Sequence, residues 1–204
     1  MSEQVVATVG DDAVLVEEVD AREDRLRATR LASALPRPGT SEGRQLRRWL
    51  VQVLVTARVV AAEAARAGVT AVDAPTEDDL LPDVPARLEI GSVAATALED
   101  GLARAVFVHR TSDVTVTDRE IAEYHARNPR RFARRSVGVG GWAPRPEQPA
   151  LDEVHADIAE HLLASARRRE FRRWLDARRA ELVHLSPGYE HPGDPRQPDN
   201  THQH

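Results

Sequence analysis

Histidine and carboxylate side chains are concentrated near the C-terminus of the sequence. Residues 183–204 contain four of the eight histidines, with Glu190, Asp194 and Asp199 among them. Imidazole and carboxylate groups are the usual protein ligands of zinc, iron, nickel and manganese. The sequence therefore suggests a site for a divalent transition metal. Its candidate ligands are His184, His191, Asp194, His202 and His204.

The same histidines also permit acid–base chemistry. His191, His202 and His204 are the candidate catalytic residues, because imidazole exchanges protons near neutral pH. Their spacing matches no established zinc signature. Two other interpretations stay open: a polar terminus without a site, or an extended, proline-containing segment that closes a ligand groove with Tyr189.

Arginine and aromatic residues supply a second group of candidates. Every basic residue is arginine, so Schiff-base and P-loop lysine chemistry is excluded. Arginine pairs and triplets recur from residue 130 to 179, and guanidinium groups bind carboxylates and phosphates in pairs of hydrogen bonds. The competing interpretation is a solvated helix face with acidic partners. The candidate ligand-binding residues are Tyr124, Arg134, Trp142 and Tyr189.

The composition and charge of the chain exclude several kinds of function and site. The 204 residues carry a formal charge of -5, which gives no case for nucleic-acid binding by bulk charge. Cysteine is absent, which excludes disulfides, thiolate metal sites and a cysteine nucleophile. No signal-peptide pattern and no apolar run of membrane-spanning length is present, so we expect a cytoplasmic protein without a membrane partner.

Hydrophobic periodicity predicts a mainly α fold with a short N-terminal strand or hairpin and an irregular C-terminal tail. We expect one helical domain over residues 1–186, built from halves at about 1–112 and 113–186, followed by a His/Pro-rich tail at 187–204. Gly68 is the expected C-cap of the most periodic helix, and Thr117 opens a capping box. Residues 69–85 are either a loop or contain a short acidic helix capped by Thr76. The expected strands cover 5–9 and 13–16, and the expected helices cover 17–35, 45–67, 90–109, 117–128 and 151–183.

Four segments, in this order, resemble parts of SurA/PrsA-type chaperone foldases. Residues 5–20 resemble the opening strand, turn and helix of that family, and residues 50–69 resemble its long second helix. Residues 116–132 resemble the helix that leads into its parvulin domain. Residues 171–182 resemble the helix that follows that domain.

The resemblance implies a chaperone-like helical core without prolyl isomerase activity. Only residues 133–150 separate the last two segments, which is too short for a parvulin domain. The expected function is therefore the binding of an apolar peptide, a partner or a small ligand in a helical groove. The alternative is a cytosolic enzyme of small-molecule biosynthesis whose His-rich tail completes the active site. A homodimer, or a protein that docks an acidic carrier through its arginines, is a third hypothesis.

Overall fold

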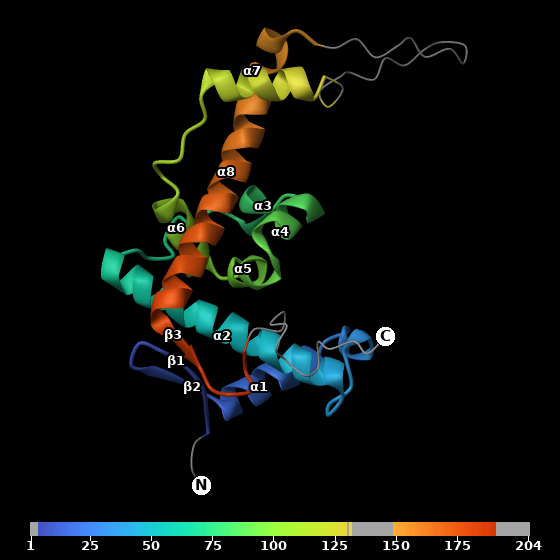
Figure 1. Cartoon of the computed structure of the whole chain (residues 1–204), viewed down its shortest axis with the longest axis vertical. Coiled ribbons are helices and arrows are strands. Elements are labelled where there is room, and N and C mark those ends of the chain that lie inside the picture. The colour runs from blue at the N-terminus through green and yellow to red at the C-terminus, as the bar shows by residue number, and fades with distance from the viewer. Residues whose placement is uncertain (1–3, 130, 132–148, 191–204) are drawn as a thin grey trace, which may run out of the picture.

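The computed structural model describes residues 4–129, 131 and 149–190. These residues form eight α-helices, one 3₁₀ turn and a three-stranded sheet (Figure 1). The predicted fold class, mainly α with a short N-terminal hairpin, is confirmed. Within the described ranges, no helix combines the length and the apolar character needed to cross a membrane.

The sheet joins the beginning of the chain to the end of its longest helix. Strands β1 (Val5–Val9) and β2 (Asp12–Leu15) form the predicted hairpin. Strand β3 (Val183–Leu185) pairs antiparallel with the other edge of β1, so the strand order is β2-β1-β3. The sequence analysis assigned Val183 to a helix and missed β3. So short a strand depends on its partner strand rather than on a local pattern.

Two helices follow the hairpin. Helix α1 (Val16–Arg27) is shorter than predicted, and a 3₁₀ turn (Ala32–Ala34) lies in the region expected to continue it. Helix α2 (Ser41–Ala67) confirms the most periodic prediction, and Gly68 ends it in a left-handed conformation at φ +66°. Its inward side chains lie in the larger hydrophobic core, against the sheet and the last helix.

Four short helices lie between residues 69 and 110, and the first of them is the short acidic helix capped by Thr76 that was one of the two alternatives for residues 69–85. They are α3 (Glu77–Leu80), α4 (Val84–Ile90), α5 (Ser92–Ala97) and α6 (Gly101–Arg110). The single helix predicted over 90–109 is wrong. Gly91 has φ +88° between α4 and α5, and the Asp100 carboxylate accepts hydrogen bonds from the first backbone amides of α6.

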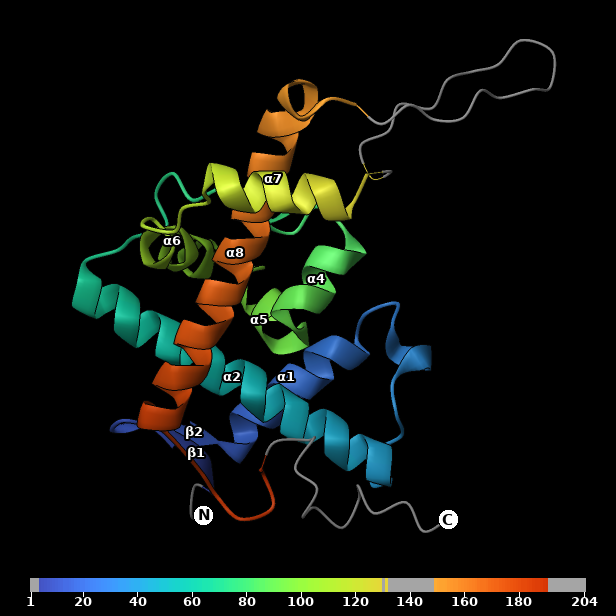
Figure 2. The same ribbon diagram turned by 45° about the horizontal axis from the view of Figure 1, so that its top comes forward.

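The next helix and the first turns of the last helix form the upper part of the molecule in Figures 1 and 2, and the last helix runs from there to the sheet. Helix α7 (Asp118–Arg127) begins at the predicted Thr117 capping box and lies across the first turns of α8 (Leu151–Leu182). Helix α8 is continuous over 32 residues. Its first turns form a small hydrophobic cluster with α7, around Ile121, Val154 and Ile158. Its last turns lie in the larger core, so one helix connects both clusters.

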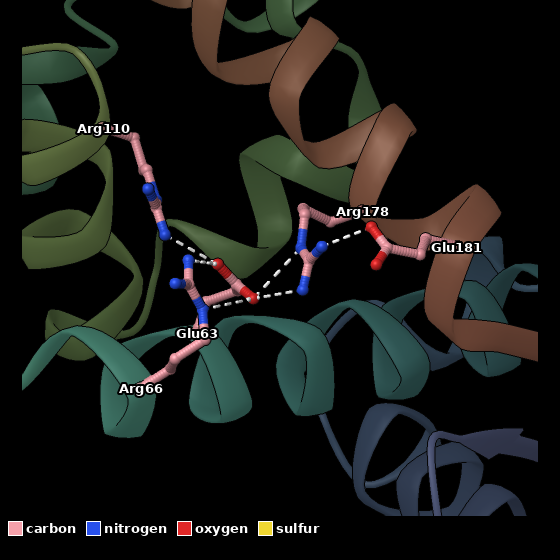
Figure 3. A network of polar contacts seen from close by, with 5 residues as sticks. All are labelled: Glu63, Arg66, Arg110, Arg178 and Glu181. Carbon is pink, nitrogen blue, oxygen red and sulfur yellow. Dashed lines mark hydrogen bonds and ion pairs between the residues drawn. The ribbon is translucent and has the colours of Figure 1, made fainter.

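A buried carboxylate fixes α8 against the rest of the core. Glu63 of α2 is 2% exposed and accepts hydrogen bonds from Arg66, Arg110 and Arg178 (Figure 3). These arginines come from α2, α6 and α8. The hydrogen bond from Arg66 and those from Arg178 lower the pKa of Glu63 to about 2, although burial opposes the shift. One carboxylate therefore ties three helices together.

Candidate functional site

A concave surface lies beside the α3–α4 segment, where α8 passes between the two hydrophobic clusters. It has a volume of about 810 Å³. Its walls come from α3, α4, the middle of α8 and Arg131, which are far apart in the sequence. Six carboxylates line it, and three basic side chains accompany them. The carboxylates are Asp78, Asp79, Asp83, Glu89, Asp157 and Glu160, and the basic residues are Arg131, His161 and Arg168.

Two of the six carboxylates shape the wall of the cleft. Asp79 and Thr76 form a reciprocal capping box at the start of α3, with hydrogen bonds in both directions. The hydrogen bond from the Thr76 side chain lowers the pKa of Asp79. Asp83 caps α4 by accepting a hydrogen bond from the backbone N–H of Ala86 at 2.8 Å. These two carboxylates stabilise α3 and α4, which are too short to be stable helices on their own.

Glu89 anchors α4 to α8. Its carboxylate accepts hydrogen bonds from the Ser165 hydroxyl, from Arg168 Nε at 2.7 Å and from Arg169 at 3.2 Å. Burial would raise the pKa of Glu89, but the hydrogen bonds from Ser165 and Arg168 outweigh it and lower the pKa. Arg168 also donates to the backbone carbonyl of Leu80. The walls of the cleft are therefore fixed to one another by polar contacts.

Within the described residues, the other three carboxylates of the cleft neither cap a helix nor pair with an arginine. Asp78, Asp157 and Glu160 are exposed and line the cleft. Within the described ranges, their side chains make no hydrogen bond or ion pair. Asp157 and Glu160 are three residues apart on α8, so they lie on the same side of that helix. The cleft thus presents negative charge to a ligand.

His161 lies at the edge of the cleft nearest α7. Its ring is 5.5 Å from the Tyr124 ring, centroid to centroid. Burial lowers the pKa of His161, and the positive charges of Arg131 and Arg168 lower it further. His161 is therefore held neutral near physiological pH, and the excess of carboxylates is not offset by a histidine charge.

An apolar surface lies next to the negative one. Val84 and Leu88 are 67% and 74% exposed, and they are four residues apart on α4. Pro85 and Glu89, on the neighbouring face of the same helix, line the cleft. Exposed aliphatic side chains beside a polar cleft are typical of a surface that contacts a partner.

The structure separates the residues that the sequence analysis grouped. Tyr124 lies beside His161 at the edge of the cleft. Tyr189 packs instead against the larger core, and its backbone carbonyl lies 3.5 Å from Nε2 of Gln52. His184 is exposed on β3, opposite Thr8. Four predicted metal ligands and two predicted ligand-binding residues lie outside the described ranges: His191, Asp194, His202, His204, Arg134 and Trp142.

No group of three or more histidines, aspartates or glutamates suited to a metal occurs among residues 4–129, 131 and 149–190. The cleft carboxylates were not predicted as a site. Their signal in the sequence is weak: an acidic stretch at 76–79 and a charged side of α8, which resemble ordinary solvated segments. Only the packing of α3 and α4 against α8 brings them together.

Comparison with known proteins gives one partial match. A model of a family of unknown function, DUF7158, matches residues 5–42. This segment contains β1, β2, α1 and the first residues of α2, and none of the residues that line the cleft. No curated protein matches the chain, and no solved structure matches it.

Proposed function

We propose that the chain is a SurA-like binding protein without isomerase activity, which holds a basic, partly apolar peptide segment of a partner protein. The binding site is the cleft between the α3–α4 segment and α8. The observation that carries the proposal is a set of carboxylates, Asp78, Asp157 and Glu160, that have no partner among the described residues and line a cleft of about 810 Å³. A cationic occupant compensates that charge, and complementary charges also speed its encounter.

The apolar part of the occupant follows from α4. Val84 and Leu88 extend the cleft with aliphatic surface that water covers in the free protein. Burying such side chains contributes on the order of 1 kcal/mol or more each. A segment that alternates arginine or lysine with leucine or valine matches both surfaces. The sequence analysis expected an apolar occupant, and the charge of the cleft refines that expectation.

The order of elements supports the chaperone-like part of the proposal. The N-terminal hairpin, the long helix α2 and the closing helix α8 share one hydrophobic core, and β3 returns to β1. These elements contain three of the four segments that resemble SurA/PrsA-type proteins; the fourth, residues 116–132, contains α7, which packs on the first turns of α8. The enzyme alternative depends on His191, His202 and His204, which lie outside the described ranges, and it remains a prediction.

The test uses a fluorescein-labelled peptide of alternating arginine and leucine residues, with fluorescence anisotropy as the measurement. Two comparison peptides replace arginine by glutamate, or leucine by serine. The proposal expects the basic amphipathic peptide to bind, the serine peptide to bind more weakly and the glutamate peptide not to bind. Equal binding of the arginine and glutamate peptides would overturn the role given to the carboxylates.

A further inference from the structure

A second, smaller pocket lies between α5 and α8, apart from the acidic cleft. Its volume is about 220 Å³. Four α8 residues line it, spaced so that they share one side of the helix: Arg172, Leu175, Asp176 and Arg179. Residues 90–94, from the end of α4 and the beginning of α5, form the opposite wall. Two arginines therefore line one small cavity that also has apolar walls.

Among the described residues, Arg179 lacks the carboxylate partner that Arg58, Arg168 and Arg178 have. Arg58, Arg168 and Arg178 each have a carboxylate oxygen within 3 Å. In the described part of the chain, Arg179 has no carboxylate within ion-pair distance, and it donates a hydrogen bond to the neutral Oε1 of Gln52. A partly buried charge without a counter-charge is costly.

The electrostatics of the pocket agree with this geometry. Burial lowers the pKa of Arg179 from its ordinary value, and the nearby charge of Asp176 only partly opposes the shift. Arginine nevertheless stays protonated in proteins, so the charge persists. Asp176 is 3.9 Å from Arg172, at the outer limit for an ion pair. Two positive charges and one negative charge leave the pocket with a net positive charge.

We propose that this pocket binds a small organic carboxylate. Its carboxylate group pairs with the guanidinium groups of Arg179 and Arg172, and its short hydrocarbon part lies against Ile90, Val93 and Leu175. The planar fork of a guanidinium matches the two oxygens of a carboxylate. Ile90 and Leu175 are each 2% exposed, so Val93, which is half-buried, supplies most of the apolar surface that the ligand can contact. A volume of about 220 Å³ accommodates a short-chain carboxylate.

The pocket contains a natural reporter of occupancy. The indole N–H of Trp49 donates a hydrogen bond to the hydroxyl of Ser92 at 3.2 Å, and Ser92 lines the pocket. A bound ligand changes the surroundings of Ser92 and therefore the resonance of the Trp49 indole N–H. A Trp49→Phe variant assigns that resonance among the three tryptophans of the chain.

The experiment titrates the full chain with isovalerate and follows the Trp49 indole signal by ¹H–¹⁵N NMR. The uncharged isostere isovaleramide tests the need for the carboxylate. The variant Arg179→Gln removes a positive charge that pairs with the carboxylate of the ligand in this proposal. Arg173→Gln is the matched control, because Arg173 is exposed on the same helix and pairs with Glu170. The proposal expects saturable shifts with isovalerate, no shift with the amide, at least a tenfold weaker affinity in Arg179→Gln and an unchanged affinity in Arg173→Gln.

Three results would overturn the proposal. They are the absence of a saturable shift with isovalerate, equal shifts with isovaleramide, and equal affinity in the Arg179→Gln and control variants. Stronger binding of inorganic phosphate than of isovalerate would reject the carboxylate assignment. If Arg179→Gln does not fold, as judged by circular dichroism, Arg172→Gln takes its place, because Arg172 is exposed and its replacement leaves the core intact.

Discussion

Glu63 on α2 and Arg178 on α8 are joined by a hydrogen bond of 2.6 Å between Oε1 and Nη2. The carboxylate is almost completely buried and also receives Arg66 and Arg110. Because α8 connects both hydrophobic clusters, this contact fixes the helix that carries one wall of the proposed cleft. Helix α8 therefore contributes both to the stability of the fold and to the geometry of the proposed cleft.

Replacing Glu63 by glutamine is expected to lower the free energy of unfolding by about 3 kcal/mol. The variant leaves three guanidinium groups without their shared counter-charge, and breaking a buried ion pair typically costs 3–5 kcal/mol. Urea unfolding followed by circular dichroism measures the change. Glu181→Gln is the control, because its carboxylate is 62% exposed and also pairs with Arg178. We expect the control to lose less than about 1 kcal/mol. Equal losses would contradict the central role of Glu63.

The contribution of Glu63 to stability is expected to depend on pH. Its pKa in the folded protein is about 2, below the ordinary value of 4.5. A lowered carboxylate pKa stabilises the fold fully above the unfolded pKa, and this stabilisation is lost as the pH falls through the folded pKa. The difference in unfolding free energy between the native chain and Glu63→Gln is therefore largest above about pH 5 and shrinks towards pH 2. A constant difference across this range would argue against the shift.

Truncation before β3 is expected to destabilise the fold, whereas truncation after Glu190 is not. Ser186 donates its backbone N–H to Val6, and Arg48 donates to the carbonyl of Gly188, so residues 183–190 belong to the core. A chain ending at Leu182 loses these contacts and the packing of Tyr189. We expect it to lose on the order of 3 kcal/mol of stability. A chain ending at Glu190 should unfold at nearly the same urea concentration as the full chain, and a large shift there would contradict this assignment.

The hypothesis of a metal site near the C-terminus is tested by comparing the full chain with the chain that ends at Glu190. If the tail histidines form a metal site, plasma mass spectrometry of the full chain after incubation with zinc, iron, nickel or manganese gives about one metal ion per chain. The chain ending at Glu190 then contains none. Our account of the cleft predicts that peptide binding is the same in both chains and is unaffected by a chelator. Loss of peptide binding on chelation would contradict this account of the cleft.

Local sequence signals predicted the parts of the fold that depend on local chemistry. The Thr117 capping box, the Gly68 C-cap and the apolar periodicity of α2 act within one helix, and each was found where expected. Strand β3 depends on pairing with β1, which lies at the other end of the chain. The break between α5 and α6 depends on Asp100, which caps α6. This cap was not predicted, because Asp100 lies within a stretch whose apolar residues follow a helical pattern.

The candidate site was harder to predict for the same reason. Asp157 and Glu160 lie on an ordinary charged face of α8, and Asp78 lies in the short acidic helix α3. The spacing of these residues in the sequence does not indicate that they are close in space. The packing of α4 on α8 brings the two segments together. The pattern that did attract attention, the histidines near the C-terminus, lies mostly outside the described ranges.

The most direct test of the proposed function compares binding of the arginine–leucine peptide to three full chains by fluorescence anisotropy. They are the native protein, the double variant Asp157→Asn/Glu160→Gln and the control Glu99→Gln. Glu99 is an exposed carboxylate that does not line the cleft. Two lost charges at roughly 1 kcal/mol each predict a loss of affinity of about tenfold or more in the double variant, with Glu99→Gln unchanged. The difference between the chains should diminish at high salt. Equal affinity in all three chains, or no binding to the native protein, would contradict the account.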